Sequence, residues 1–152
     1  MSDLRDLYQQ VILDHNKRPR NFRIIDASSH KADGHNPLCG DQVTVYLVVK
    51  DGIIRDLAFQ GCGCAISTAS ASLMTEILKG RSLAEVQDLF EDFHDAVTGQ
   101  GELPPGLGKL AILAGVRDYP TRVKCATLAW HTLRAALEHR EKPVATEGIT
   151  AS

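Results

Sequence analysis

The chain has 152 residues and a net charge of −2, a length that suits a single domain with a core of its own. This small charge gives no electrostatic reason to expect binding to nucleic acid or to an anionic membrane. No apolar run approaches a membrane span and the start of the chain lacks a signal-peptide pattern, so we expect a cytoplasmic protein with reduced thiols.

The first predicted element is an amphipathic helix at the start of the chain. We expect it to end near His15, because Pro19 follows soon afterwards and cannot continue a helix. Its apolar residues recur at helical spacing: Leu4, Leu7, Tyr8, Val11 and Ile12. This pattern predicts a helix with one face on the core.

A β-hairpin is predicted over residues 42–60. Both halves of this segment are rich in β-branched and aromatic residues, and Asp51-Gly52 between them is a strong signal for a two-residue turn. Such a turn fixes the register of the two strands and pairs Lys50 with Ile53.

The predicted register brings cysteines together at the open end of this hairpin. Extended that far, it places Cys39 opposite Cys64 and Asp41 opposite Cys62. All four side chains would then lie on one face of the sheet, because side chains alternate along a strand. The sequence therefore predicts that three thiols and a carboxylate lie near one another.

Two predicted helices begin near cysteines. One starts just after Cys64, with Ser67 as its N-cap, and ends at Gly80. The other has Thr121 as its N-cap, which places Cys125 in the first turn on the apolar face. A thiol near the N-terminus of a helix is favoured as thiolate, the form that binds metal and attacks sulfur.

Two further helices and two irregular segments complete the chain. A capping box at Ser82 to Glu85 opens a helix whose core face is predicted to hold Leu83, Val86, Phe90, Phe93 and Val97. Residues 110–115 are expected to form a short helix after a loop at 99–108. Residues 143–152 are expected to form a flexible tail.

The predicted fold class is α+β. Helices and strands do not alternate along the chain, which argues against a parallel βαβ arrangement. We expect a small antiparallel β-sheet, made of the hairpin at 42–60 and an edge strand, packed against several α-helices. Residues 1–142 are expected to form one domain.

The segments around three cysteines resemble the motifs of the IscU/SufU family, also called the NifU amino-terminal family. The resemblance covers about residues 4–140 and includes the opening segment from Tyr8 to His15. The three motifs are Asn36-Pro37-Leu38-Cys39-Gly40-Asp41, Gly63-Cys64-Ala65-Ile66-Ser67 and Arg122-Val123-Lys124-Cys125-Ala126. The resemblance implies a compact α+β domain that acts in iron–sulfur cluster assembly.

Two features are similar to the SufU branch of this family. IscU-type proteins carry a histidine immediately before the third motif cysteine, whereas this chain has Lys124. The stretch between Cys64 and Cys125 is also longer, as it is in SufU proteins.

The SufU resemblance implies a zinc site and a sulfur-transfer function. Cys39, Asp41, Cys64 and Cys125 would bind one Zn²⁺. Cys39 would accept sulfur as a persulfide from a SufS-type cysteine desulfurase, for delivery to a downstream iron–sulfur assembly scaffold. The protein would therefore be a sulfurtransferase-like partner of the desulfurase rather than an enzyme with a triad of its own.

Two basic residues of the third motif are candidates for a supporting role. The ligand set carries more negative charge than a zinc ion neutralises, so Arg122 and Lys124 are expected to contact the site or the partner.

Cys62 departs from the family pattern, which usually has no cysteine at this position. Two interpretations of this residue remain open. It is either a small residue in a glycine-rich turn, or a thiol that competes with Asp41 as a ligand or relays sulfur. The six histidines are scattered along the chain, and none is assigned as a ligand.

Two other functions remain open. One is a scaffold that assembles a 2Fe–2S cluster on the same ligands, because thiolate and carboxylate suit iron as well. The other is a purely structural zinc domain, although a chain with this much apolar periodicity is not expected to need metal to fold.

Overall fold

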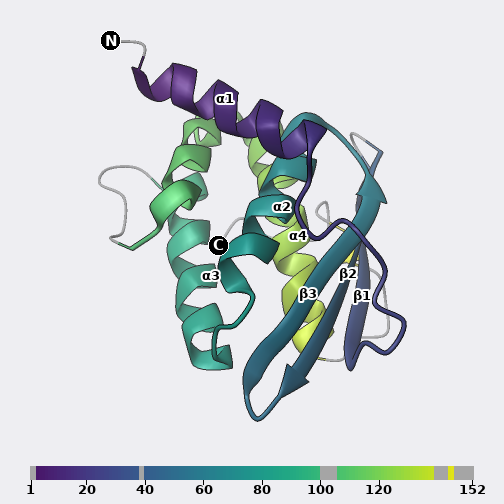
Figure 1. The fold of residues 1–152 in the computed structure, drawn as a ribbon. Coiled ribbons are helices and arrows are strands. Elements are labelled where there is room, and N and C mark those ends of the chain that lie inside the picture. Colours follow the sequence, from purple (N-terminus) through teal and green to yellow (C-terminus); the bar gives the residue numbers. More distant parts are fainter. Residues whose placement is uncertain (1–2, 38–39, 100–105, 139–143, 146–152) are drawn as a thin grey trace.

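The computed structural model describes residues 3–37, 40–99, 106–138 and 144–145, and its fold is α+β (Figure 1). The predicted class is confirmed: a small sheet packs against several helices. In chain order the elements are α1 (Asp3–Lys17), β1 (His30–Asn36), β2 (Asp41–Lys50), β3 (Ile53–Cys62), α2 (Ala65–Leu78), α3 (Leu83–Thr98), the 3₁₀ helix η1 (Gly108–Val116), α4 (Pro120–Leu137) and β4 (Val144–Ala145).

The sheet has the strand order β3-β2-β1-β4. β2 pairs antiparallel with both β1 and β3, and the short β4 pairs in parallel with β1. Two residues of the predicted flexible tail therefore form a strand at the edge of the sheet. The rest of that tail lies outside the described residues, as do residues 100–105 of the predicted loop.

The turn of the β2–β3 hairpin is at Asp51-Gly52, as predicted. Both residues have positive φ, 57° at Asp51 and 73° at Gly52, as a type I′ turn requires. Lys50 pairs with Ile53 and so confirms the register beside the turn.

The register prediction is wrong beyond a β-bulge in this hairpin. The pairing shifts between Val48 and Val49, because Val48 pairs with Asp56 while Val49 pairs with Ile54. One extra residue in β3 moves every later pair by one position. At the open end, Cys62 therefore pairs with Gln42 and not with Asp41.

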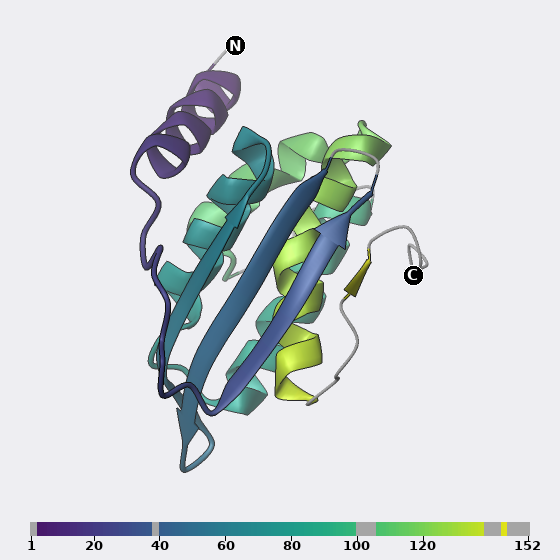
Figure 2. The ribbon, with the colours of Figure 1, turned by 90° about the vertical axis from the view of Figure 1, so that its right-hand side faces the viewer.

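The helices lie on one side of the sheet. In Figure 2 the sheet faces the viewer, with α4 and α2 behind it. α4 packs on β1 and β2, and α2 packs on β3 and on α4. α3 lies farther from the sheet and contacts α4, where the Phe93 ring stacks on that of Trp130 at 4.4 Å. The core fills the space between these layers.

A buried histidine of α1 contacts the middle of α2. His15 is 1% exposed, and its Nδ1 lies 2.7 Å from the Ser72 hydroxyl. The same hydroxyl accepts a hydrogen bond from the Arg20 backbone N–H at 2.8 Å. Burial lowers the pKa of His15, so the neutral imidazole is favoured. This anchor positions α1 beside the end of the sheet that carries the cysteines.

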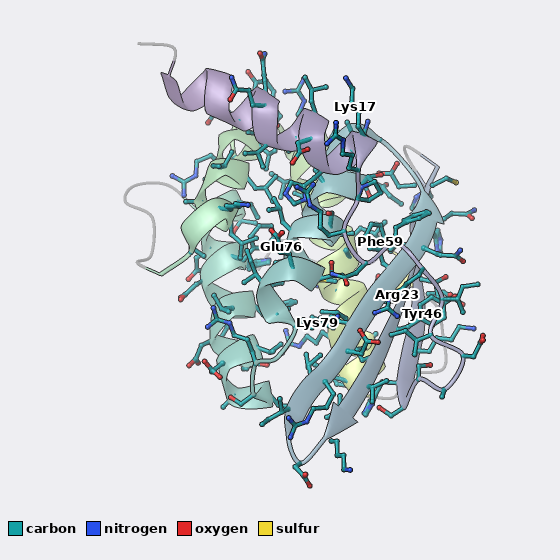
Figure 3. All side chains as sticks on the ribbon, in the orientation of Figure 1. Lys17, Arg23, Tyr46, Phe59, Glu76 and Lys79 are labelled. Atoms are coloured by element: carbon teal, nitrogen blue, oxygen red, sulfur yellow. The ribbon has the colours of Figure 1, made fainter. Side chains whose placement is uncertain are left out.

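The segment after α1 runs along β3. The Phe22 ring meets that of Phe59 edge-on at 5.2 Å, and the Arg23 backbone N–H donates to the Phe59 carbonyl at 3.0 Å. Arg23 and Lys79, both labelled in Figure 3, form ion pairs with Asp56. These contacts cover the outer edge of the hairpin.

Two helices differ in detail from the prediction. α3 begins with the predicted capping box between Ser82 and Glu85, but Leu83 is 36% exposed and does not face the core. The short helix predicted at 110–115 is the 3₁₀ helix η1, and it is longer at both ends. Among the described residues, no helix combines the length and apolar character needed to cross a membrane.

Candidate metal centre

Three potential metal ligands meet where β2, α2 and α4 begin. One ligand atom from each of Asp41, Cys64 and Cys125 lies within 4.8 Å of the other two. Asp41 is the first residue of β2, Cys64 directly precedes α2, and Cys125 lies near the start of α4. Segments far apart in the sequence therefore deliver two thiols and a carboxylate to one point.

The Asp41 carboxylate is buried and held in place by backbone. Asp41 is 1% exposed, and its Oδ1 accepts a hydrogen bond from the Cys64 backbone N–H at 2.9 Å. Its Oδ2 lies 3.7 Å from the Cys64 Sγ. A Cβ at position 63 would come within 2.8 Å of Oδ1, so this close approach requires Gly63.

Cys64 is itself the N-cap of α2, a role that the sequence had assigned to Ser67. The Cys64 sulfur accepts a hydrogen bond from the Ser67 backbone N–H at 3.4 Å. A hydrogen bond with Cys125 lowers the pKa of Cys64 to about 7, and backbone N–H groups of Ser67 and Ile66 act in the same direction against burial and Asp41. The thiol is exposed to solvent, so it is both activated and accessible.

Cys125 lies deeper, two residues farther into its helix than predicted. The N-cap of α4 is Tyr119 and Pro120 is the first helical residue, which places Cys125 in the second turn. The side chain points inward as predicted, since Cys125 is 3% exposed. The buried Asn36 amide donates toward the Cys125 sulfur at 4.0 Å.

Cys39, the remaining predicted ligand, lies outside the described residues. Its described neighbours Pro37 and Gly40 belong to the turn that joins β1 to β2. The turn is closed by a hydrogen bond from the Gly40 N–H to the Asn36 carbonyl at 2.8 Å, and Asn36 pairs with Asp41.

The bulge removes the geometric reason for treating Cys62 as a competing ligand. Cys62 pairs with Gln42, the residue after Asp41, so its side chain is on the opposite face of the sheet from the carboxylate. Both Cys62 and Gln42 are exposed. Cys62 is not part of the three-ligand cluster found among the described residues.

Tyr8 and Arg122 border the centre. The exposed Arg122 guanidinium lies 4.6 Å over the Tyr119 ring at the start of α4, and Lys124 is half-buried one residue before Cys125. The Tyr8 ring lies 3.3 Å from where a Cβ on Gly115 would stand. Within the described ranges, the buried Tyr8 hydroxyl is left without a hydrogen-bond partner.

The pKa of Tyr8 is affected by charged groups at the centre. Burial raises the pKa of the phenol, Arg122 opposes that shift, and Cys64 adds to it. Sequence reasoning missed Tyr8 and Asn36 as neighbours of the site, although both lie inside segments that resemble the family motifs. Their position in those segments was the available signal, because nothing in their residue type indicates a role.

The donor set suits zinc or iron. Ligand atoms about 2.0 to 2.3 Å from a tetrahedral zinc ion are about 3 to 4 Å apart, so a cluster within 4.8 Å needs only a small contraction. Thiolates and a carboxylate are ligands that both metals accept. A tetrahedral ion held by these three side chains would have one further coordination position.

The sequence and the fold match proteins of known families. Residues 7–126 match the family described as NifU-like N terminal domain. The chain is 40% identical over 139 residues to the iron–sulfur cluster assembly scaffold protein IscU of Streptococcus pyogenes serotype M1, covering 91% of this chain and 87% of that protein. It is 38% identical over 141 residues to the zinc-dependent sulfurtransferase SufU of Bacillus subtilis (strain 168), covering 92% and 95%.

A solved structure confirms the arrangement of the elements. The crystal structure of a SufU, described as a putative iron–sulfur cluster assembly scaffold protein for the SUF system of Fervidobacterium islandicum AW-1, superimposes with a TM-score of 0.80. Its sequence is 33% identical, and the match covers 86% of this chain and 96% of that one.

Proposed function

The chain belongs to the NifU-like N-terminal domain family, and on that premise we propose that it is a zinc-dependent sulfur acceptor in iron–sulfur cluster assembly. In this proposal it takes persulfide sulfur from a SufS-type cysteine desulfurase. The observation that carries the proposal is the meeting of Asp41, Cys64 and Cys125 within 4.8 Å. The similarity to a protein named zinc-dependent sulfurtransferase supports zinc as the metal.

The proposed ligand set is Cys39, Asp41, Cys64 and Cys125. A bound zinc ion would keep the thiols deprotonated without redox chemistry of its own. The Cys64 thiolate caps α2, and Cys125 is buried in α4, so both are tied to the fold. We assign the transfer step to Cys39, because its place in the sequence between β1 and β2 lies outside the helices to which the other two thiols belong.

The transfer step moves one sulfur atom and changes no overall oxidation state. The Cys39 thiolate attacks the outer sulfur of the persulfide on the desulfurase. A new sulfur–sulfur bond forms at Cys39 as the bond in the donor breaks, and the donor cysteine leaves as a thiolate. A downstream iron–sulfur assembly scaffold would then receive the sulfur by the same kind of exchange.

Arg122 and Lys124 are proposed to help the desulfurase dock beside this site. Arg122 is exposed at the start of α4, where its charge is available to a partner. We place the reaction in the cytoplasm, where thiols stay reduced.

A scaffold that assembles a 2Fe–2S cluster is the second candidate. The similarity to a protein named iron–sulfur cluster assembly scaffold favours it, and the same thiols and carboxylate would suit iron.

Two measurements separate these candidates. Elemental analysis of freshly purified protein with a visible absorption spectrum is expected to give one zinc and no colour. A brown protein with iron and sulfide would support the scaffold instead. In a desulfurase assay, Cys39→Ala, Cys64→Ala and Cys125→Ala should each lose most of the zinc or most of the stimulation.

Cys62→Ala is the matched control for those variants. It removes an exposed thiol from the same glycine-rich segment without touching the three-ligand cluster. It should keep both zinc and stimulation. If Cys62→Ala is as damaging as Cys64→Ala, the proposed ligand set is wrong.

A further inference from the structure

A buried asparagine connects separate parts of the candidate metal centre. Asn36 is the last residue of β1 and is 0% exposed. Its backbone carbonyl accepts the Gly40 N–H, it pairs with Asp41 on β2, and its side-chain amide donates toward the Cys125 sulfur. Given the proposed ligand set, on which this inference rests, we infer that Asn36 is a positioning residue that orients the Cys125 sulfur on the metal.

Close packing of β1 against α4 brings the amide to the sulfur. A Cβ on Gly34 would overlap the Thr132 hydroxyl and lie 3.2 Å from the Leu128 Cδ1, so this approach requires glycine. Asn36 follows Gly34 by two residues and is therefore on the same face of β1. Cys125 precedes Leu128 by about one turn of α4. The strand and the helix thus place Asn36 beside Cys125, and Figure 2 shows α4 directly behind the sheet.

The contact suits a sulfur that is bound to metal. A buried amide costs free energy unless its polar atoms find partners, and here the side-chain N–H lies 4.0 Å from the Cys125 Sγ. A cysteine that binds metal does so as thiolate. Hydrogen bonds to ionised acceptors are shorter and stronger than those to neutral ones. Metal binding at Cys125 should therefore tighten this contact.

The same residue holds the turn between β1 and β2. The hydrogen bond from the Gly40 N–H to the Asn36 carbonyl is 2.8 Å long and directly precedes Asp41 at the start of β2. The backbone of Asn36 therefore fixes the carboxylate ligand, while its side chain reaches the ligand sulfur of α4.

This arrangement would separate the roles of two thiols of the proposed ligand set. A hydrogen bond to a ligand sulfur withdraws electron density from it and fixes its direction toward the metal. Cys125 would therefore stay bound as a weak nucleophile while the proposed transfer step takes place at Cys39.

Cobalt substitution measures how strongly the ligand sulfurs donate. Co²⁺ accepts the ligands of a tetrahedral zinc site, and its sulfur-to-cobalt charge-transfer absorption moves to lower energy when a sulfur donates more strongly. Asn36→Leu keeps the branched shape of the side chain and removes the amide. The variant should shift this absorption to lower energy and weaken Co²⁺ and Zn²⁺ binding about 10-fold or more.

Thr132→Val is the matched control. Thr132 is as deeply buried between α4 and β1 as Asn36, and its hydroxyl donates to the Leu128 carbonyl at 2.7 Å. Valine keeps the shape and removes that hydroxyl about 10 Å along α4 from Cys125. The control should keep the parent absorption and affinity. Far-UV circular dichroism verifies the fold, and Asn36→Ala replaces Asn36→Leu if the leucine variant does not fold.

Two results would overturn the role of the amide while the ligand set stands. One is a charge-transfer absorption in the Asn36 variant identical to that of the parent, even with a lower affinity, because a purely structural residue would behave in this way. The other is an equal shift in Thr132→Val, which would indicate a general disturbance of α4. Failure of the proposed ligand set would look different: the parent protein itself would show no sulfur-to-cobalt absorption, and the inference would fall with it.

Discussion

The substitution Asp41→Asn should change the stability of the metal-free and zinc-loaded protein in opposite directions. The Asp41 Oδ2 lies 3.7 Å from the Cys64 Sγ, and its Oδ1 accepts the Cys64 backbone N–H. Asparagine keeps the shape and one acceptor but removes the negative charge. Its amide nitrogen can also donate a hydrogen bond to the thiolate.

The magnitude follows from the separation of the two groups. Two unit charges 3.7 Å apart repel by about 1 kcal/mol in water and about 4 kcal/mol at an effective dielectric constant of 20. The pKa of Cys64, lowered to about 7, makes the thiolate substantially populated at neutral pH. Because Cys64 is exposed, we expect the lower figure: metal-free Asp41→Asn gains about 1 kcal/mol in free energy of unfolding.

Zinc binding should show the reverse effect. Loss of an anionic ligand should weaken zinc binding by about 10-fold or more, and each factor of ten removes about 1.4 kcal/mol of the stabilisation that zinc provides. Urea unfolding of the chelator-treated and zinc-loaded forms measures both quantities. The matched control is Asp33→Asn, which removes a carboxylate from the same sheet where it accepts a hydrogen bond from Thr44 at 2.6 Å.

The control should change both forms by the same amount, because Asp33 lies outside the cluster. The reasoning is refuted if metal-free Asp41→Asn is destabilised while zinc stabilises it as much as it stabilises the parent protein. That result would make Asp41 an ordinary buried hydrogen-bond acceptor and not a ligand.

Three other substitutions test the surroundings of the site. Gly63→Ala places a methyl group 2.8 Å from the Asp41 Oδ1 and should weaken zinc binding about 10-fold in competition with a chromophoric chelator. Tyr8→Phe removes a buried hydroxyl without a described partner, so urea unfolding should show equal stability or a gain of up to about 1 kcal/mol. Burial lowers the pKa of His15, so its stabilisation is present above the unfolded pKa of about 6.5 and is lost on acidification. His15→Gln should therefore lose less free energy of unfolding than the parent between about pH 7 and about pH 5.

Each of these predictions has a contradicting outcome. Unchanged zinc affinity in Gly63→Ala would show that the Asp41 carboxylate does not stay in its observed position when metal binds. A loss of more than about 1 kcal/mol in Tyr8→Phe would mean that the hydroxyl has a hydrogen-bond partner. Identical pH dependence in His15→Gln and the parent would show that His15 is not held neutral in the folded state.

The features of the fold that local sequence encodes were predictable. The Asp51-Gly52 turn follows from residues that tolerate positive φ, and the capping box from the side chains of Ser82 and Glu85. The α+β class follows from the order of apolar periodicities. The bulge between Val48 and Val49 carries no such local signal, and it changed the register from there to Cys62.

The segments that form the site were predictable from the sequence. The contacts between their side chains were not. The motifs pointed to Asp41, Cys64 and Cys125, and the structure brings those three together. Sequence alone did not reveal that Cys64 caps α2, because a thiol is not among the usual capping residues. The contact of Asn36 with Cys125 joins residues 89 positions apart and depends entirely on how α4 packs against β1.

The most direct test of the proposed function is to locate the transferred sulfur. Zinc-loaded protein is incubated with a SufS-type cysteine desulfurase and L-cysteine, and persulfides are trapped and mapped by mass spectrometry. The account predicts the extra sulfur on Cys39 in the parent protein and in Cys62→Ala. Sulfur found mainly on Cys62, or no persulfide on any cysteine while zinc is retained, would contradict it.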